Sequence, residues 1–369
     1  ESVFGNGLAP MIDADVCISC GKCEKVHYSL QSTLKRSLGI TFGAKLMDEK
    51  LRAQSSSGGI FSALAYAVLN DKGLVVGAAF DSNLVLRHVV VSSADELAPL
   101  RGSKYLQSRI DDGVLRQVRA ALIEERSVLF VGTPCQIAGL RAYLQDICQD
   151  NLIAVDLVCH GSPSQSVFDS YIDDLERQYR GRALECQFRN KESRYGWSNY
   201  QVCVQFDNGA KSVCSFRDKD AYGRAFIDNL LLRPSCYNCQ FKGVDRASDI
   251  TLGDFWGVEN IHSNEYDISG VSLVIANTEI GVNALRDLKS LAYCFETTPD
   301  AMNNNGGYIS VSRMNAKRND AIRDLESGCS FGAVVNKYPN EGKLNSVVRY
   351  LIRKGRDVYH LALSKNNGF

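Results

Sequence analysis

The chain has 369 residues, of which 45% are hydrophobic and 23% are charged. This composition is ordinary for a globular protein, and the length is enough for two or three hydrophobic cores. The 42 lysines and arginines balance the 42 aspartates and glutamates, so nucleic acid is not expected as a partner. No stretch reaches the roughly 20 apolar residues that a membrane span needs, and no signal peptide is visible, so a cytoplasmic protein is expected.

Cysteine is the residue type that stands out, with 13 copies in the chain. The odd number, the length of the chain and the absence of an export signal favour reduced thiols over a disulfide framework. Reduced thiols are also the ligands that zinc and iron–sulfur clusters use. The positions of the cysteines therefore carry most of the functional information.

Residues 1–30 are predicted to be irregular and to form a partial ferredoxin-like segment with Cys17, Cys20 and Cys23. This C-x2-C-x2-C spacing lets successive thiolates bind one face of a cubane cluster. In the bacterial ferredoxin run a fourth cysteine follows and serves a second cluster, but His27 occupies that position here. The fourth ligand of this set would be either a residue outside the sequence or His27, which is otherwise an ordinary surface histidine.

The next segment alternates predicted helices and strands. A serine- and glycine-rich stretch, Ser55–Gly59, precedes an apolar helix that its serines can cap, Ile60–Leu69. After it we predict two strands, a helix, and two strand–loop–helix units. Their ranges are Leu74–Phe80, Leu86–Val91, Asp112–Glu125, Val128–Val131 with a helix from Gln136, and Leu152–Val158 with a helix from Ser164.

The two strand–loop–helix units predict that Cys135 and Cys159 are neighbours. Strands that alternate with helices form a parallel sheet with right-handed crossovers, and the loops after such strands share one edge. Cys135 lies in a Gly-Thr-Pro-Cys-Gln loop and Cys159 in a Cys-His-Gly loop, each directly after its strand. Both thiols should therefore lie at the carboxyl edge of the sheet.

The rest of the chain predicts an added antiparallel layer and further strands. Its elements are the strands Leu184–Arg189, Tyr200–Phe206 and Lys211–Phe216, a helix Ala221–Leu232, the strands Ile250–Phe255 and Val271–Asn277, and a basic amphipathic tail helix, Lys343–Ser364. The predicted fold class is α/β with a mostly parallel central sheet, flanking helices and a small antiparallel β-layer. The predicted divisions are 1–30, a flavin-binding part 31–180, a part with the antiparallel strands 181–335, and the tail 336–369.

Cys236 and Cys239 form a C-x2-C pair, in which a tight turn brings two sulfurs close together. With Cys135 and Cys159 they make a four-thiolate set that suits one iron–sulfur cluster. A structural zinc site is the alternative, but zinc ribbons usually pair two C-x2-C turns rather than single cysteines on sheet-edge loops. The other cysteines lack metal spacing and are interpreted as small hydrophobic residues: Cys148, Cys186, Cys203, Cys214, Cys294 and Cys329.

Two further loops have the residue types that bind phosphate or flavin. Ser56, Ser57, Gly58 and Gly59 precede a helix, where backbone N–H groups and the helix dipole favour an anion. Gly102, Ser103 and Lys104 add hydroxyl and ammonium groups. Each signal is weak alone, because such residues also make plain caps and turns. His160, beside Cys159, is either a proton donor or a residue that tunes the site through a hydrogen bond.

Six motifs follow one another along the chain: Ser55–Gly59, Gly102–Tyr105, Gly132–Gln136, Cys159–Gly161, Arg233–Cys239 and Asp249–Gly257. As an ordered set they resemble the family of coenzyme F420 hydrogenase/dehydrogenase beta subunits over roughly residues 13–277. The resemblance implies FAD and one [4Fe–4S] cluster. By position it assigns the cluster to Cys135, Cys159, Cys236 and Cys239. It brings the Ser57–Gly59 loop and Gly132, Thr133 and Pro134, with Gln136, close to FAD.

The expected function is an iron–sulfur flavoprotein oxidoreductase. A ferredoxin or similar donor would deliver electrons through [4Fe–4S] and FAD to a small organic acceptor. The acceptor would be either the deazaflavin coenzyme F420 or another small molecule, for example one in polysaccharide biosynthesis. One alternative is a zinc-stabilised, non-redox binding or assembly protein in glycan synthesis. Another is an electron-transfer protein without a substrate pocket of its own, which would act with a partner enzyme.

Overall fold

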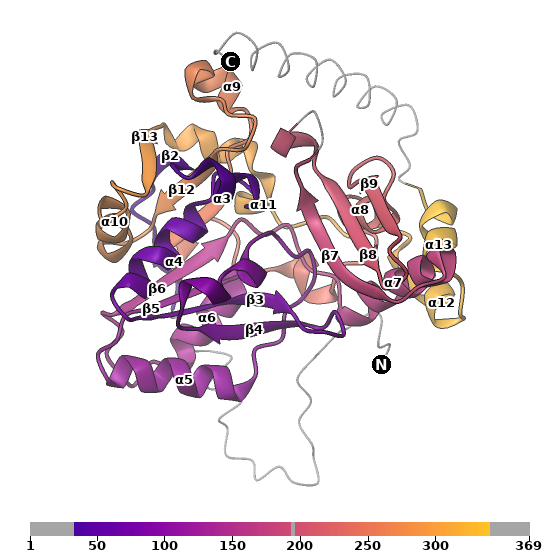
Figure 1. Ribbon diagram of the computed structural model, residues 1–369, viewed down its shortest axis with the longest axis horizontal. Coiled ribbons are helices and arrows are strands. Elements are labelled where there is room, and N and C mark those ends of the chain that lie inside the picture. The colour runs from indigo at the N-terminus through magenta and orange to yellow at the C-terminus, as the bar shows by residue number, and fades with distance from the viewer. Residues whose placement is uncertain (1–32, 193–195, 340–369) are drawn as a thin grey trace.

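The computed structural model describes residues 33–192 and 196–339 (Figure 1). The segment with Cys17, Cys20 and Cys23 and the predicted tail helix lie outside the described residues. Within the described residues, no helix is long and apolar enough to cross a membrane.

A sheet of eight strands organises the larger part of the described chain. Its order is β13-β2-β12-β11-β6-β5-β3-β4. Strands β2, β11, β6, β5 and β3 point the same way, and the antiparallel strands are β12, β13 and β4. The bounds are β2 Ile40–Leu46, β3 Leu74–Phe80, β4 Leu86–Val91, β5 Val128–Gly132, β6 Leu152–Leu157, β11 Ile250–Asp254, β12 Ser272–Ala276 and β13 Ala292–Glu296.

Helices cover both faces of this sheet. Successive residues of its central strands point to opposite faces, and the residues on both faces are apolar. Leu129 of β5 packs in a core with α4 (Ile60–Asn70) and α10 (Glu279–Arg286). Phe130, the next residue, packs in a second core with α5 (Asp112–Ile123) and α6 (Pro134–Tyr143). Such runs, apolar on both faces, are typical of sheets buried between helix layers. The result is a three-layer α/β arrangement.

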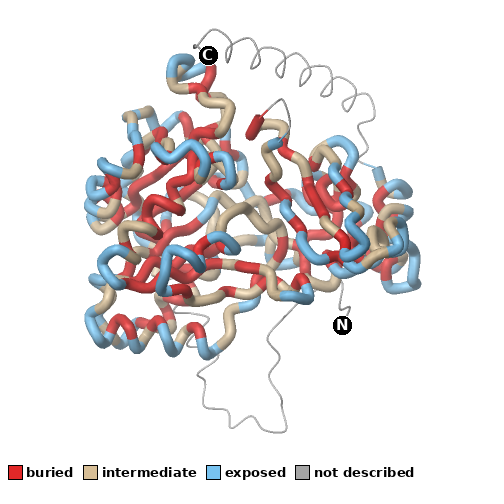
Figure 2. Tube along the Cα trace, viewed as in Figure 1, coloured by how far each residue is buried: buried red, intermediate tan, exposed pale blue. Residues whose placement is uncertain are grey.

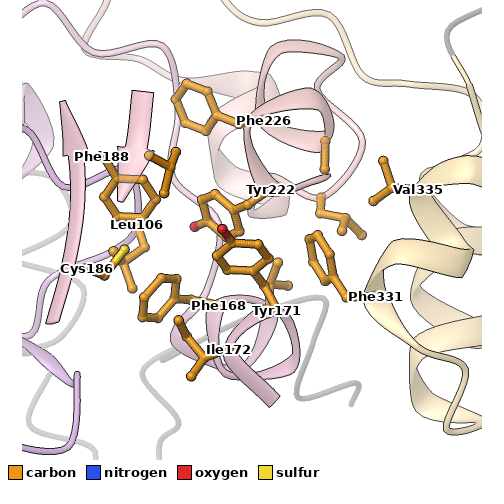
Figure 3. Packing of buried hydrophobic residues seen from close by; sticks show 14 of the residues in the cluster. Leu106, Phe168, Tyr171, Ile172, Cys186, Phe188, Tyr222, Phe226, Phe331 and Val335 are labelled. Atoms are coloured by element: carbon orange, nitrogen blue, oxygen red, sulfur yellow. The ribbon is translucent and has the colours of Figure 1, made fainter. Parts of the chain in front are cut away.

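The antiparallel layer is a separate three-stranded sheet beside the large one (Figure 1). Its strands are β7 (Ala183–Asn190), β8 (Gln201–Phe206) and β9 (Lys211–Ser215). Aromatic residues of these strands pack against α7 (Gln165–Tyr179), α8 (Ala221–Ile227), α12 (Arg318–Glu326) and α13 (Phe331–Lys337). Figure 3 shows Phe168, Tyr171, Phe188 and Tyr222 at the centre of this core. Figure 2 shows buried segments concentrated in the two sheets.

Short elements complete the described chain. They are β1 (Lys35–Arg36), α3 (Glu49–Ala53), β10 (Asp245–Arg246), α9 (Val258–Ile261), α11 (Gly306–Ile309) and the 3-10 turns η1 (Ala94–Glu96), η2 (Ala98–Leu100), η3 (Gly196–Asn199), η4 (Pro234–Asn238), η5 (Ser263–Glu265) and η6 (Pro299–Asn304). Strand β1 pairs with β10 antiparallel.

The predicted fold class is confirmed, and most predicted elements lie within two residues of their observed bounds. Helix α8 is shorter than predicted, and Asn229 just beyond its end has a left-handed φ of 55°. The large sheet takes strands from both sides of residue 180, so the predicted boundary there separates segments of sequence that share one sheet.

Candidate functional site: a four-cysteine centre at the sheet edge

The loops with Cys135 and Cys159 follow the adjacent parallel strands β5 and β6. Gly132 is the last residue of β5, and Pro134 is the first residue of α6, where its missing N–H is not needed. Thr133 and Gln136 form a capping box at this helix start. Gln136 Oε1 accepts from Thr133 N at 2.9 Å. The helix thus begins two residues before the predicted position, and Cys135 lies in its first turn.

The Cys236–Cys239 turn packs against the Cys159 loop. The Arg233 N–H donates to the Ser162 carbonyl at 3.0 Å, and the Ser162 N–H donates to Cys236 Sγ at 3.4 Å. Gly161 permits this approach, since it has a φ of 151° and a Cβ there would lie 2.7 Å from Leu232. Two loops from distant parts of the chain are thereby joined.

Cys135 and Cys159 both lie close enough to Cys236 and Cys239 to be affected by them electrostatically. Burial raises the pKa of the Cys159 thiol to about 12, and Cys135, Cys236 and Cys239 raise it further while Lys242 opposes them. Burial likewise raises the pKa of Cys135, with Cys239 and Cys236 acting in the same direction. Cys135 is nevertheless accessible to solvent. The prediction that Cys135 and Cys159 follow neighbouring parallel strands is confirmed.

The four thiols fit the chemistry of a cluster site. Thiolates are the ligands of iron–sulfur clusters, and a bound metal supplies the positive charge that buried thiolates need. Among the described residues, no three His, Cys, Asp or Glu side chains are placed to hold a single metal ion.

The other described cysteines do not all behave as predicted. Cys186 and Cys203 are buried, as expected for small hydrophobic residues. Cys148, Cys294 and Cys329 are exposed, so the prediction was wrong for these three. Their segments lie at the surface, where absence of metal spacing does not imply burial.

His160 is anchored by neighbouring side chains and backbone. Its Nε2 lies 2.6 Å from Asn229 Oδ1, and its ring lies 4.9 Å from the Phe226 ring, centroid to centroid. Burial lowers the pKa of His160, although the contacts with Asn229 and the Phe226 backbone oppose this. These contacts favour the interpretation of His160 as a residue that tunes the site, and proton donation stays a prediction.

The serine- and glycine-rich loop is held differently from the prediction. The N-cap of α4 is Gly59, with a φ of 85° and no side-chain cap, so the expected serine cap was wrong. Ser57 Oγ donates instead to the Val271 carbonyl at 2.7 Å, and Ser103 Oγ donates to Ser56 Oγ at 2.8 Å. The serines are drawn to neighbouring loops because β2, which leads into this segment, pairs with β12.

The loop nevertheless fits an anionic group of a cofactor. Gly58 approaches the sheet so closely that a Cβ would lie 2.3 Å from the Ala44 carbonyl. Among the described residues, no acceptor is found for the N–H groups of Ser57 and Gly59. Free N–H groups at a helix start, with no side chain in the way, are what a pyrophosphate requires.

The Gly102–Lys104 loop lies against this segment through Ser103. Gly102 has a φ of 79° and open space where a Cβ would be. Lys104 donates from Nζ to the carbonyls of Pro99 and Arg101, each at 2.8 Å. Burial lowers the pKa of Lys104 to about 7.

Two cations at the end of β7, which sequence reasoning missed, hold the Ser55–Gly59 loop in place. Arg189 donates to the Ser56 carbonyl and, through both terminal nitrogens, to Asp254 at 2.8 and 3.0 Å. Lys191 donates to the carbonyls of Arg52 at 3.1 Å, Ser57 at 2.9 Å and Ser269. A signal was present, because two basic residues at positions i and i+2 at a strand end share one face of the strand.

Two family models match the chain. The family model for the N-terminal part of the coenzyme F420 hydrogenase/dehydrogenase beta chain matches residues 41–112, and the model for the C-terminal part of the same beta chain matches residues 125–301. Together they match more than half of the chain. The chain belongs to this family. The name of the family describes a hydrogenase/dehydrogenase, which indicates a role in redox chemistry.

One curated relative is a component of the F(420)H(2) dehydrogenase of Methanosarcina mazei, 27% identical over 162 residues, which are 43% of this chain and 44% of the relative. The match therefore spans less than half of that relative. Among solved structures, a chain of the F420-reducing [NiFe] hydrogenase complex from Methanosarcina barkeri is 15% identical with a TM-score of 0.48, covering 83% of this chain and 92% of that one.

Proposed function

We propose that the chain is an FAD- and [4Fe–4S]-dependent oxidoreductase that passes electrons between a protein donor and a small organic acceptor. The proposal is supported by the position of Cys135 and Cys159 after adjacent parallel strands and by the hydrogen bonds that join the Cys236–Cys239 turn to the loop after Cys159. The Ser–Gly loop after β2 reaches the same edge, because β2 runs parallel to β5 and β6 in the sheet. A cluster and a flavin would thus be neighbours.

Each group has a proposed set of residues. Cys135, Cys159, Cys236 and Cys239 would hold the cluster, and the N–H groups of Ser57 and Gly59 would bind the pyrophosphate of FAD. When bound, the cluster supplies single-electron transfer and the flavin supplies conversion between one- and two-electron chemistry. The cluster of Cys17, Cys20 and Cys23 stays a prediction, since those residues lie outside the described ones.

The protein's own contribution is charge balance and orientation. Arg233 acts electrostatically on Cys135 and Lys242 on Cys159, in the direction that favours their thiolates. Lys242 also donates to the Cys159 carbonyl and, at 2.7 Å, to that of Gly307. These cations would offset the negative charge of a thiolate-ligated cluster and so help to set its potential.

Donor and acceptor are proposed by class. The names of the family and of the relatives support coenzyme F420 as the acceptor or donor of a hydride. Another small molecule, including one in polysaccharide biosynthesis, is the second possibility. A ferredoxin-like protein or another protein of the same complex would exchange single electrons with the cluster.

Metal and flavin analysis of the full chain, purified without oxygen, tests the proposal. We expect iron, sulfide and FAD in the wild type, loss of iron in Cys159→Ser, and retention of iron in the control Cys148→Ser, whose thiol is exposed and outside the set. Zinc without iron would instead support a zinc-stabilised binding protein. Equal iron content in all three proteins would show that the core cysteines do not bind the cluster.

A further inference from the structure

Asn229 lies just beyond the end of α8, at a position that glycine usually occupies. Its φ is 55°. The Asn229 N–H donates to the Phe226 carbonyl at 3.2 Å, and the Leu230 N–H donates to the Ala225 carbonyl at 2.9 Å. These two bonds form the Schellman motif, in which the left-handed residue is most often glycine because glycine has no Cβ. The helix end therefore does not explain the asparagine side chain.

The side chain of Asn229 holds the loop that follows Cys159. Its Nδ2 donates to the Arg313 carbonyl at 3.0 Å, which fixes the orientation of the amide and directs Oδ1 to His160 Nε2, 2.6 Å away. Since an amide oxygen only accepts, His160 carries a proton on Nε2 in this contact. The His160 carbonyl accepts from Ser312 Oγ. The residue next to Cys159 is thus held by its ring and by its backbone.

The backbone carbonyl of Asn229 holds the turn with two further cysteines. It accepts from the Tyr237 hydroxyl at 2.6 Å, and the same hydroxyl accepts from the Leu232 N–H at 3.1 Å. Tyr237 lies between Cys236 and Cys239. One residue therefore bonds to both segments, through its side chain on one and through its carbonyl on the other.

We propose that Asn229 is a positioning residue of the four-cysteine centre, which keeps the loop after Cys159 and the Cys236–Cys239 turn at a fixed separation. A [4Fe–4S] cluster needs its thiolates in a fixed arrangement, and the hydrogen bonds around the ligands contribute to its potential. Asn229 adds a second connection to the direct contacts of Ser162 with this turn. The inference rests on the proposed function, since it takes these cysteines as the ligands of one cluster.

Thiol labelling of the metal-free full chain measures the positioning directly. Asn229→Gly suits the end of α8 and removes both side-chain hydrogen bonds. Cys159 should react with iodoacetamide about tenfold faster than in the wild type, as expected when two hydrogen bonds no longer oppose local opening. Cys186, which is buried in the aromatic core, is the reference in the same molecules, and its rate should stay within about twofold.

Asn208→Gly is the matched control. Asn208 Nδ2 also donates to two backbone carbonyls, those of Tyr179 and Arg180, but it lies in the turn between β8 and β9. Cys159 should react in this variant at the wild-type rate. In the iron-loaded protein, Asn229→Gly should alter the EPR spectrum of the reduced cluster, and Asn208→Gly should leave it unchanged.

Tyr237→Phe removes the connection from the other side, so labelling of Cys236 should become faster while that of Cys186 stays constant. An equal rise at Cys159 and Cys186 in Asn229→Gly would show that Asn229 only stabilises the fold. An unchanged rate at Cys159 would also contradict the proposal. Because labelling needs neither iron nor FAD, a wild type without iron would contradict the oxidoreductase proposal and leave this test intact.

Discussion

Lys191 illustrates how single charged residues shape the candidate flavin loop. Its ammonium group donates to three backbone carbonyls, which uses all three of its N–H bonds. Burial lowers the pKa of Lys191 to about 7, with Arg189 adding to this effect while Asp254 and Asp267 oppose it and Arg52 lowers the pKa further. Near neutral pH, the residue is therefore divided between a form with three donors and a neutral form with two.

FAD binding should depend on pH through Lys191. The pyrophosphate is negative and favours the protonated lysine, so by linkage the affinity for FAD should fall as pH rises above about 7. Calorimetric titration of the apoprotein from pH 6 to 9 measures this slope, which should flatten in Lys191→Met and in Lys191→Arg. An unchanged slope in both variants would contradict the role of Lys191.

The same shift has the opposite effect on apoprotein stability. The unfolded lysine has a pKa near about 10.4 and keeps its proton where the folded one has lost it. The contribution of Lys191 to the free energy of unfolding should therefore rise as pH increases through 7.

Strand β4 carries a second pH-dependent group, His88. Its ring is 3% exposed, stacks on Phe130 at 5.3 Å and places Nε2 at 3.0 Å from the Val131 carbonyl. Burial lowers the pKa of His88 to about 4, so the unfolded chain binds a proton more readily. Stability should fall as pH drops from 6.5 to 4, by up to about 3 kcal/mol.

His88→Gln keeps a donor for Val131 and removes the titration. Urea unfolding at pH 7 and pH 5 should show a smaller loss of stability in this variant than in the wild type. The same loss in both proteins would show that acid acts elsewhere.

Gly58 and Gly102 allow the cost of a steric clash to be compared with the cost of backbone strain. Gly58→Ala would place a Cβ against backbone atoms of Ala44 and Ser272 that cannot move freely, and should cost about 2–3 kcal/mol. Gly102→Ala meets no atom within 4 Å but keeps a φ of 79°, and should cost about 1 kcal/mol. Chemical unfolding measures both, and the reverse order would contradict the described contacts of the Gly58 loop.

The elements that sequence predicts best are those decided by local pattern. Apolar runs such as Leu152–Leu157 fix the central strands, and strand–loop–helix order fixes the shared edge of Cys135 and Cys159. Strands β2 and β13 were missed because their residues pair with segments far away in the sequence. The serine cap failed for a related reason, since Ser57 is bonded to Val271, which no local pattern indicates.

At the scale of the whole molecule, the site is assembled from both sheets. The loops of the large sheet contain Cys135, Cys159 and Ser55–Gly59, while Arg189 and Lys191 lie at the end of β7 in the smaller sheet. The cysteine pair itself was predictable as a metal turn, but its docking on Ser162 depends on the fold of the intervening layer. Loss of packing in the aromatic core of that layer should therefore weaken the binding of FAD at the Ser55–Gly59 loop, although the core does not contact FAD.

Replacing Phe188 tests this coupling. Phe188 is buried in the aromatic core of β7, one residue before Arg189. Phe188→Leu should shift β7 slightly and weaken FAD binding more than the matched change Phe130→Leu in the large sheet, measured at equal fractions folded. Equal effects on FAD binding would place the control of the loop in the large sheet alone.

The most direct measurement is the iron and sulfide content of a variant in which Cys17, Cys20 and Cys23 are all serine, purified without oxygen. This variant leaves the core cysteines as the candidate ligands. The account predicts about four irons and four sulfides per chain, as in one [4Fe–4S] cluster, together with FAD. A protein that contains FAD but no iron, or zinc in place of iron, would contradict it.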